Sequence, residues 1–216
     1  MNSLKAVLFD LDGTLLDSKK SVLEAVYYTS NKFRPGKYSY QEIEKRFGES
    51  MEEFIKLLGE ERKKEILITY MEYITRNHDE LVSLFPGVKE SLSRLRKNDY
   101  RLAVITNKQK NLTLKGLELF NISGMFDTLV TVDDVKKGKP APEPVERACI
   151  ELGVDKGNVI MVGDTIFDVE AACRADVKSA VIDWYGNYPL RQLKPDYFYT
   201  SLTDFTDQLC KYREVL

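Results

Sequence analysis

Cysteine and histidine are scarce in this chain of 216 residues, which has three cysteines and one histidine. Cys149, Cys173 and Cys210 are widely spaced and include no CxxC pair, so neither a disulfide framework nor a zinc site is expected. A reducing, cytoplasmic location is therefore the default. We expect the single histidine, His78, to lie on the surface of a helix.

Long hydrophobic runs and an excess of charge of one sign are also missing. No apolar run approaches the ~18 residues of a membrane span, and the beginning of the sequence lacks the basic and apolar regions of a signal peptide. Lys plus Arg number 32 and Asp plus Glu 34, a formal net charge of −2, whereas nucleic-acid-binding proteins normally carry a basic excess. We therefore expect a globular protein with neither a membrane nor a nucleic acid as partner.

What the sequence does contain is a series of short apolar runs that end in polar residues. Continuous apolar runs of this length fit strands buried on both faces, as in a parallel sheet. Between them lie segments with helical spacing, such as Val145, Ala148, Cys149 and Leu152. This alternation predicts an α/β fold with a doubly wound, Rossmann-like parallel sheet. The runs are residues 6–9, 100–108, 126–134, 158–165 and 179–184.

The stretch from about 19 to 82 interrupts this alternation, because it has only helical patterns. Its breaks fall at 34–39, where Ser39 is placed to cap the next helix, and at 47–50. The sequence thus predicts a core domain made of residues 1–16 plus 84–216 and a helical cap domain of residues 17–83. A cap that leaves the first strand at its carboxyl end is expected to act as a lid there, since ligands of open α/β sheets bind at that edge.

Three of the acidic residues at predicted strand ends are expected to converge in one site. Asp10 and Asp12 follow the first run, and residues two apart in a strand project to the same face, so their like charges require something positive between them. Asp164 follows the run 158–165, and oxygen ligands of this kind favour Mg²⁺. Asp168 lies one helical turn later and either orients metal-bound water or contacts Lys139. The alternative for any one of these aspartates is a turn or a helix cap.

Residues suited to an anion follow the other strand ends. Thr106 and Asn107 offer a hydroxyl and an amide where a helix is expected to start, and helix N-termini favour phosphate. Lys139 lies in the proline-rich stretch "KKGKPAPEP", which restricts its loop, although a surface lysine remains the alternative. A carboxylate can attack phosphorus to form an aspartyl-phosphate, and a second carboxyl can move the protons. The pattern therefore indicates phosphoryl transfer.

Four motifs follow one another in the chain: "DLDGT" (10–14), "VITN" (104–107), "KGKPAPEP" (137–144) and "GDTIFD" (163–168). In this order they resemble the motifs of the haloacid dehalogenase superfamily. The later segment "KPDYFYTSLTDF" (194–205) is similar to the phosphoglycolate-phosphatase-like branch of that superfamily. The resemblance implies that Asp10 is the nucleophile and Asp12 the general acid and base. It also implies that Mg²⁺ is bound by the Asp10 carboxylate, the Asp12 backbone carbonyl and Asp164, with phosphate bound by Thr106, Asn107 and Lys139.

Within this resemblance the sequence favours a Mg²⁺-dependent phosphatase that hydrolyses a small phosphomonoester, such as phosphoglycolate. The superfamily's dehalogenases generally lack the second aspartate, and its sugar-phosphate mutases usually carry a histidine in the first cap segment, which is absent from residues 17–28. A mutase, a pyrophosphatase, a receiver-like phospho-acceptor and a catalytically silent binding module remain alternatives. The expected partner is a small phosphorylated metabolite, and both a monomer and a homodimer remain open.

Overall fold

The chain divides into two compact units in the computed structural model, which describes residues 4–186 and 194–211. The core unit comprises Met1–Leu16 and Leu84–Leu216, and the helical unit comprises Asp17–Ser83. Two short strands, β2 (Leu16–Asp17) and β3 (Ser83–Leu84), lie where the chain passes between the units and pair with each other.

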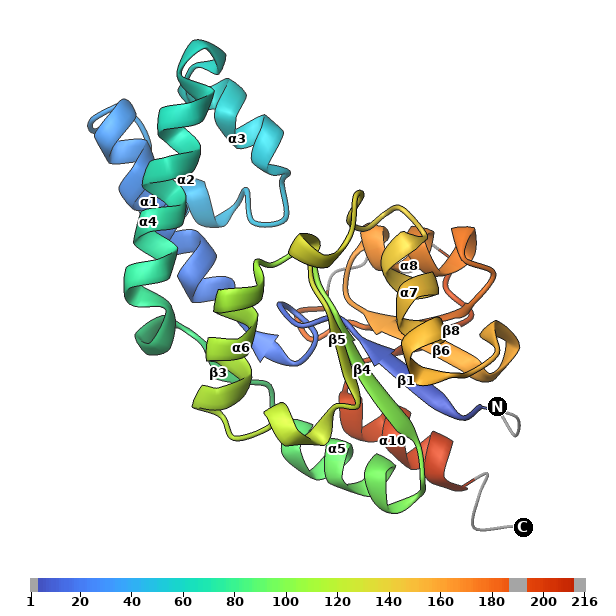
Figure 1. The fold of residues 1–216 in the computed structure, drawn as a ribbon. Helices are drawn as coiled ribbons and strands as arrows, with labels where there is room; N and C mark the ends of the chain where they lie inside the picture. Colours follow the sequence, from blue (N-terminus) through green and yellow to red (C-terminus); the bar gives the residue numbers. More distant parts are fainter. Residues whose placement is uncertain (1–3, 187–193, 212–216) are drawn as a thin grey trace. The chain divides into compact units, whose positions relative to one another are not determined.

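A six-stranded sheet forms the centre of the core unit, in the order β5-β4-β1-β6-β7-β8. Each neighbouring pair is parallel, so the predicted doubly wound parallel sheet is confirmed. The central strand β1 pairs with β4 on one side and with β6 on the other (Figure 1). The strands are β1 (Ala6–Phe9), β4 (Arg101–Ile105), β5 (Thr128–Val130), β6 (Val159–Gly163), β7 (Lys178–Ile182) and β8 (Tyr197–Tyr199).

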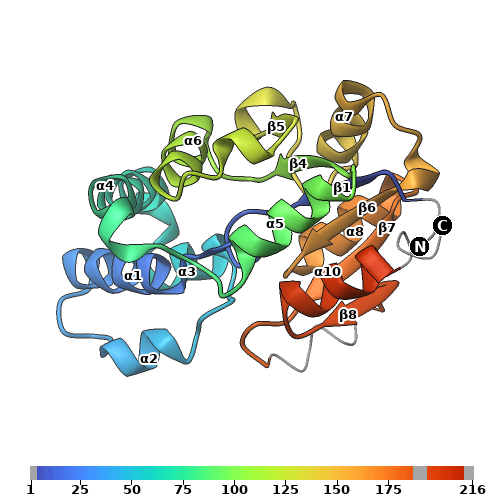
Figure 2. The ribbon, with the colours of Figure 1, turned by 90° about the horizontal axis from the view of Figure 1, so that it is seen from below.

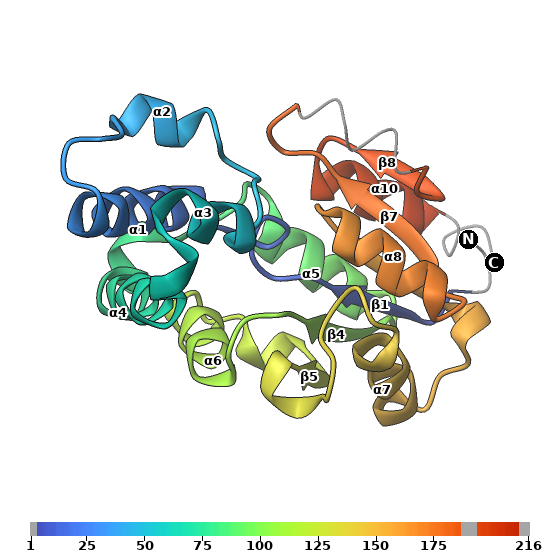
Figure 3. The same ribbon diagram turned by 90° about the horizontal axis from the view of Figure 1, so that it is seen from above.

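Helices cover both faces of this sheet, and the side chains of β1 alternate between them. Val7 and Phe9 belong to the apolar cluster that includes α5 and α10, whereas Ala6 and Leu8 belong to the cluster that includes α7 and α8. Figure 2 shows α5 and α10 in front of the sheet, and Figure 3, from the opposite side, shows α7 and α8. Burial on both faces explains why the strands are continuously apolar. The helices are α5 (Val88–Lys97), α6 (Lys110–Leu119), α7 (Glu143–Leu152), α8 (Ile166–Arg174) and α10 (Leu202–Lys211), with 3₁₀ turns η2 (Ser123–Met125), η3 (Val132–Asp134) and η4 (Lys156–Asn158).

The helical unit has an apolar core of its own. Its members come from three helices and include Phe33, Phe54 and Ile66. Ser39 caps α2 as predicted, in a capping box with Glu42 in which each residue accepts a hydrogen bond from the other's backbone N–H. The elements are α1 (Lys19–Phe33), α2 (Tyr40–Glu44), α3 (Met51–Leu58), η1 (Glu60–Arg62) and α4 (Lys63–Leu81).

The prediction that His78 is a surface residue is wrong, because its side chain is fully buried. His78 follows Ile66, Tyr70 and Ile74 at intervals of four residues along α4, so it continues the face of the helix that packs inward. Its Nδ1 lies 3.0 Å from Asp79 Oδ1. The burial of His78 is therefore determined by its position on the inward face of α4 and not by the polarity of its side chain.

Two further expectations concern cysteines and membranes. None of the three cysteines is in a disulfide, and Cys149 and Cys210 are buried. In residues 4–186 and 194–211, no helix combines the length and the apolar character that crossing a membrane requires.

Candidate active site

Three neighbouring strands deliver the predicted site residues to one edge of the sheet. Asp10 follows β1, Thr106 follows β4 and Asp164 follows β6. Phe9, the last residue of β1, is in register with Val104 and Val162 of the two flanking strands. Because all three strands are parallel, the residues that follow them meet at the carboxyl edge.

Lys139 lies between two carboxylates in the interior of this site. Its Nζ donates hydrogen bonds to Asp10 Oδ1 at 2.5 Å, to Asp168 Oδ1 at 2.6 Å and to the Ile105 backbone oxygen at 3.0 Å. The side chain of Lys139 is only 4% exposed, compared with 9% for Asp10 and 2% for Asp168. An ammonium group has three N–H donors, so these contacts use all of them.

Burial and mutual repulsion make the carboxylates difficult to ionise. Burial raises the pKa of Asp10 to about 7, since the pull of Lys139 is too weak to offset burial and the charges of Asp168 and Asp12. Burial, with the charges of Asp10 and Asp168, raises the pKa of Asp164 well above its usual range. Burial lowers the pKa of Lys139, but Asp10 and Asp168 outweigh burial and raise it. The site therefore holds a firmly protonated lysine beside carboxylates that require more positive charge.

Asp168 uses its two oxygens for different purposes. Oδ2 accepts hydrogen bonds from the backbone N–H and the hydroxyl of Thr165, at 3.0 and 2.6 Å, in the capping box that begins α8. Oδ1 accepts the hydrogen bond from Lys139. The sequence left two roles open for Asp168, the orientation of metal-bound water and contact with Lys139. The structure contains the contact with Lys139.

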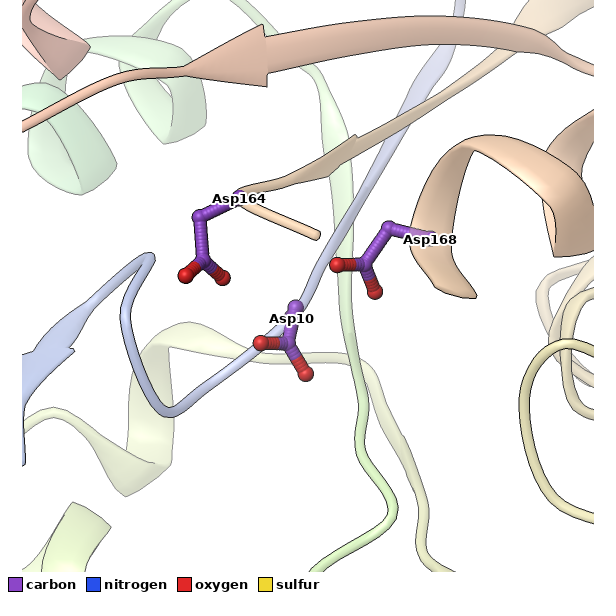
Figure 4. Close-up of side chains that lie close together, drawn as sticks. All are labelled: Asp10, Asp164 and Asp168. Carbon is purple, nitrogen blue, oxygen red and sulfur yellow. The ribbon is translucent and has the colours of Figure 1, made fainter. Parts of the chain in front are cut away.

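Asp10, Asp164 and Asp168 form a cluster able to hold a metal ion, with one oxygen from each within 4.8 Å of the others. Figure 4 shows the three carboxylates directed toward a common space. Since Asp168 is already bonded through both oxygens, Asp10 and Asp164 are the members best placed to bind a cation. An all-oxygen donor set fits Mg²⁺, and the raised pKa values of both residues show that added positive charge would stabilise their ionised forms.

Gly13 allows Asp164 to occupy this position. A Cβ at Gly13 would lie 2.1 Å from Asp164 Oδ2, and the backbone φ of +87° is one that other residues rarely adopt. The hydroxyl of the next residue, Thr14, donates to Asp164 Oδ1 at 3.1 Å. The Gly-Thr pair after Asp12 thus shapes the space around the second carboxylate.

The side chain of Asp12 lies outside this three-carboxylate cluster and contacts a lysine instead. Lys108 Nζ donates to Asp12 Oδ1 at 2.9 Å, and the side chain of Lys108 is 11% exposed. Sequence reasoning missed Lys108. The available signal was its position directly after Thr106 and Asn107 at the end of a buried strand.

The side chain of Asn107 contacts the backbone of Lys139. Its amide donates to the Lys139 carbonyl and its Oδ1 accepts from the Lys139 N–H, both at 2.8 Å. A Cβ at Gly138 would lie 2.4 Å from this Oδ1, so the glycine permits the approach. The amide of Asn107 therefore positions the lysine loop, and its contact with phosphate stays a prediction.

Thr106 is buried, and its hydroxyl accepts a hydrogen bond from the Lys108 N–H at 3.1 Å, which leaves its own hydrogen for another acceptor. The helix expected at this point begins later, since α6 starts at Lys110. A turn over residues 106–108, rather than the first turn of a helix, therefore follows β4.

Substitution of Gly13 tests how tightly this arrangement is packed. Gly13→Ala should lower the free energy of unfolding by about 1–3 kcal/mol, because the new methyl group collides with Asp164 and the backbone conformation becomes strained. Urea unfolding followed by circular dichroism measures the change. Gly124→Ala is the matched control, since its Cβ would meet no atom within 4 Å and its φ lies outside the restricted range. Equal stabilities of the two variants would contradict the packing described for Gly13.

A family model, curated relatives and solved structures were each compared with this chain. The family model of the haloacid dehalogenase-like hydrolases matches residues 7–182. Pyrophosphatase PpaX of Halalkalibacterium halodurans is 36% identical over 94% of this chain and 96% of its own length, and that of Bacillus velezensis is 36% identical over 92% and 93%. The crystal structure of a predicted phosphoglycolate phosphatase from Haemophilus somnus 129pt superposes with a TM-score of 0.84 at 26% identity, over 97% of this chain and 99% of that one. The chain belongs to the haloacid dehalogenase-like hydrolase family.

Proposed function

We propose that this protein is a Mg²⁺-dependent phosphatase that hydrolyses a small phosphorylated metabolite through an aspartyl-phosphate on Asp10. The observation that carries the proposal is the buried Asp10 carboxylate between Lys139 and Asp164. Inorganic pyrophosphate is the first substrate to test, because relatives at 36% identity are named pyrophosphatases. A small phosphomonoester such as phosphoglycolate is the second, in line with the structural neighbour at 26% identity. The proposed setting is the cytoplasm.

In the first step, a carboxylate oxygen of Asp10 attacks phosphorus, and the bond from phosphorus to the leaving oxygen breaks. Asp12 gives its proton to that oxygen as it leaves. Lys139 fixes the orientation of the Asp10 carboxylate through Oδ1, so the nucleophile does not have to be immobilised during the reaction. The Thr106 hydroxyl contacts the phosphoryl oxygens.

In the second step, water attacks the phosphorus of the aspartyl-phosphate and Asp12 takes the proton of that water. The bond between phosphorus and the Asp10 oxygen breaks, which releases phosphate and restores the carboxylate. A Mg²⁺ ion bound to Asp10, Asp164 and the Asp12 backbone carbonyl would supply positive charge that keeps Asp10 ionised and neutralises phosphoryl oxygens.

Replacement of the nucleophile is the direct test of this mechanism. Asp10→Asn should lower kcat on pyrophosphate and on phosphoglycolate by at least about 1000-fold, because an amide is a poor nucleophile. Release of inorganic phosphate measures turnover, and removal of divalent cations with a chelator should abolish it in the unmodified protein. Asp155→Asn, at an exposed aspartate of the core unit, is the control and should retain full activity. Near-normal turnover by Asp10→Asn would exclude Asp10 as the nucleophile, and full activity after chelation would exclude the metal.

Binding of Mg²⁺ should depend on pH, because the ion must displace protons from its ligands. Below pH 7 the Asp10 carboxyl is protonated, since its pKa is raised to about 7, and above pH 7 it is ionised without the ion's help. The dissociation constant for Mg²⁺ at pH 6 should therefore be at least about tenfold higher than at pH 8, since the raised pKa of Asp164 adds to the effect of Asp10. Calorimetric titration at the two pH values, in buffers of different ionisation enthalpy, measures the affinity and the protons released. An affinity that does not change between pH 6 and pH 8 would contradict this expectation.

We also propose that the helical unit, Asp17–Ser83, is a cap that selects the substrate. The chain enters this unit shortly after Asp10 and Asp12, so its residues are tethered close to the nucleophile in sequence. Replacement of residues 17–83 by a short Gly/Ser linker should reduce the differences in kcat/KM among phosphorylated metabolites. Mg²⁺ binding by the shortened protein reports whether the core has folded. If the folded, Mg²⁺-binding core keeps the full-length order of substrates, specificity comes from the core's own loops.

A further inference from the structure

Lys108 is a mostly buried cation that has no part in the mechanism given above. It follows β4 directly after Thr106 and Asn107, and its backbone N–H donates to the Thr106 hydroxyl at 3.1 Å. Its Nζ lies 2.9 Å from Asp12 Oδ1, with 11% of the side chain exposed. A short turn therefore holds a second ammonium group against the proposed acid and base.

The two lysines of the site differ in how many of their donors are occupied. Lys139 donates to Asp10, to Asp168 and to a backbone oxygen, which accounts for its three N–H groups. Lys108 Nζ has one acceptor among residues 4–186 and 194–211, the Asp12 carboxylate. Two of its N–H groups are therefore available to an anion, whereas Lys139 would have to give up an existing hydrogen bond.

The position of Lys108 determines which part of a substrate it can reach. Asp12 must contact the leaving oxygen in order to protonate it, and Lys108 is one hydrogen bond away from Asp12. We propose, on the basis of the proposed function, that Lys108 binds the leaving group and selects substrates whose leaving group is itself an anion. The class to which this points is the phosphoanhydrides, above all inorganic pyrophosphate, whose leaving group is a second phosphate.

The electrostatic argument is that negative charge on the leaving phosphate grows as the bond from phosphorus to the bridging oxygen breaks. A cation beside that oxygen binds the transition state more strongly than the ground state, which raises kcat as well as affinity. A leaving phosphate keeps negative charge on its other oxygens after Asp12 protonates the bridging one, whereas a leaving alcohol that Asp12 protonates carries no charge. Lys108 should thus favour pyrophosphate over the phosphate ester of an uncharged alcohol.

Lys108→Met tests this inference, because it removes the charge and retains most of the apolar side chain. We expect kcat/KM for pyrophosphate to fall by about 10- to 100-fold more than kcat/KM for glycerol 2-phosphate, whose leaving alcohol is uncharged. Lys108→Arg, which keeps the charge, should recover most of the activity on pyrophosphate. Lys110→Met is the matched control, since that lysine is half exposed and pairs with Asp134 at 3.0 Å.

Binding of imidodiphosphate, a non-hydrolysable analogue of pyrophosphate, gives a readout that does not depend on turnover. In the presence of Mg²⁺, Lys108→Met should bind imidodiphosphate at least about tenfold more weakly than the unmodified protein and bind inorganic phosphate equally well. Equal losses on pyrophosphate and glycerol 2-phosphate would overturn the inference, since Lys108 would then only position Asp12. An unmodified protein that hydrolyses glycerol 2-phosphate but neither cleaves pyrophosphate nor binds imidodiphosphate would also overturn it while the proposed phosphatase activity stands. Lack of turnover on every phosphorylated substrate would instead be a failure of the proposed function.

Discussion

The contact of the Lys139 ammonium group with Asp10 and Asp168 is the interaction on which the rest of the site depends. Two carboxylates this close and this deeply buried would repel each other strongly if no cation lay between them. Lys139 removes part of that repulsion and also ties three segments together, since it contacts the ends of β1 and β4 and the first turn of α8. A buried ion pair is costly to break from one side only, because the remaining charge is left without a partner.

The parallel sheet brings together the groups that the Lys139 ammonium contacts. Asp10 and the backbone of Ile105 are at the ends of adjacent strands, and Asp168 caps the helix that begins immediately after β6. The loop that carries Lys139 is fixed in turn by the amide of Asn107, which forms two hydrogen bonds with the Lys139 backbone. The side chains at the strand ends thus serve two purposes. Some, such as Asp10, are available for chemistry, and others, such as Asn107, hold the reactive side chains and their neighbours in position.

The sequence was sufficient to predict the fold, since continuous apolar strands alternating with amphipathic helices leave few other arrangements. It also located Asp10 and Asp164 at strand ends, because each is a charged residue that directly follows a continuous apolar run. Lys108 was missed because a single lysine after a strand has the same sequence pattern as an exposed surface lysine. Its contact with Asp12 depends on the path of the backbone over residues 106–108. Residue type alone was also a poor guide to burial, as His78 shows.

The partners of Asn107 and of one Asp168 oxygen could not be fixed from the sequence, because those partners lie far away in the chain. Each residue has two polar atoms, and only the contact of Asp168 Oδ2 with Thr165 is local. Asn107 bonds with a backbone 32 residues later, and Asp168 divides its oxygens between Thr165 and Lys139. Sequence spacing predicts that such residues meet at one edge of the sheet, but tertiary contacts decide whether they bind a ligand or another residue.

The charges of the candidate active site indicate the order in which a cation and a phosphorylated substrate would bind. Four carboxylates, those of Asp10, Asp12, Asp164 and Asp168, are accompanied by two ammonium groups, one of which has no donor left. A phosphate dianion that approached this set would meet an excess of negative charge, or protonated carboxyls that cannot act as nucleophiles. A divalent cation removes both obstacles at once, because it balances the excess charge and favours the ionised form of Asp10. In the mechanism that we propose, the cation should therefore bind before the substrate, and the affinity of the protein for phosphate should be gained largely after the cation is in place.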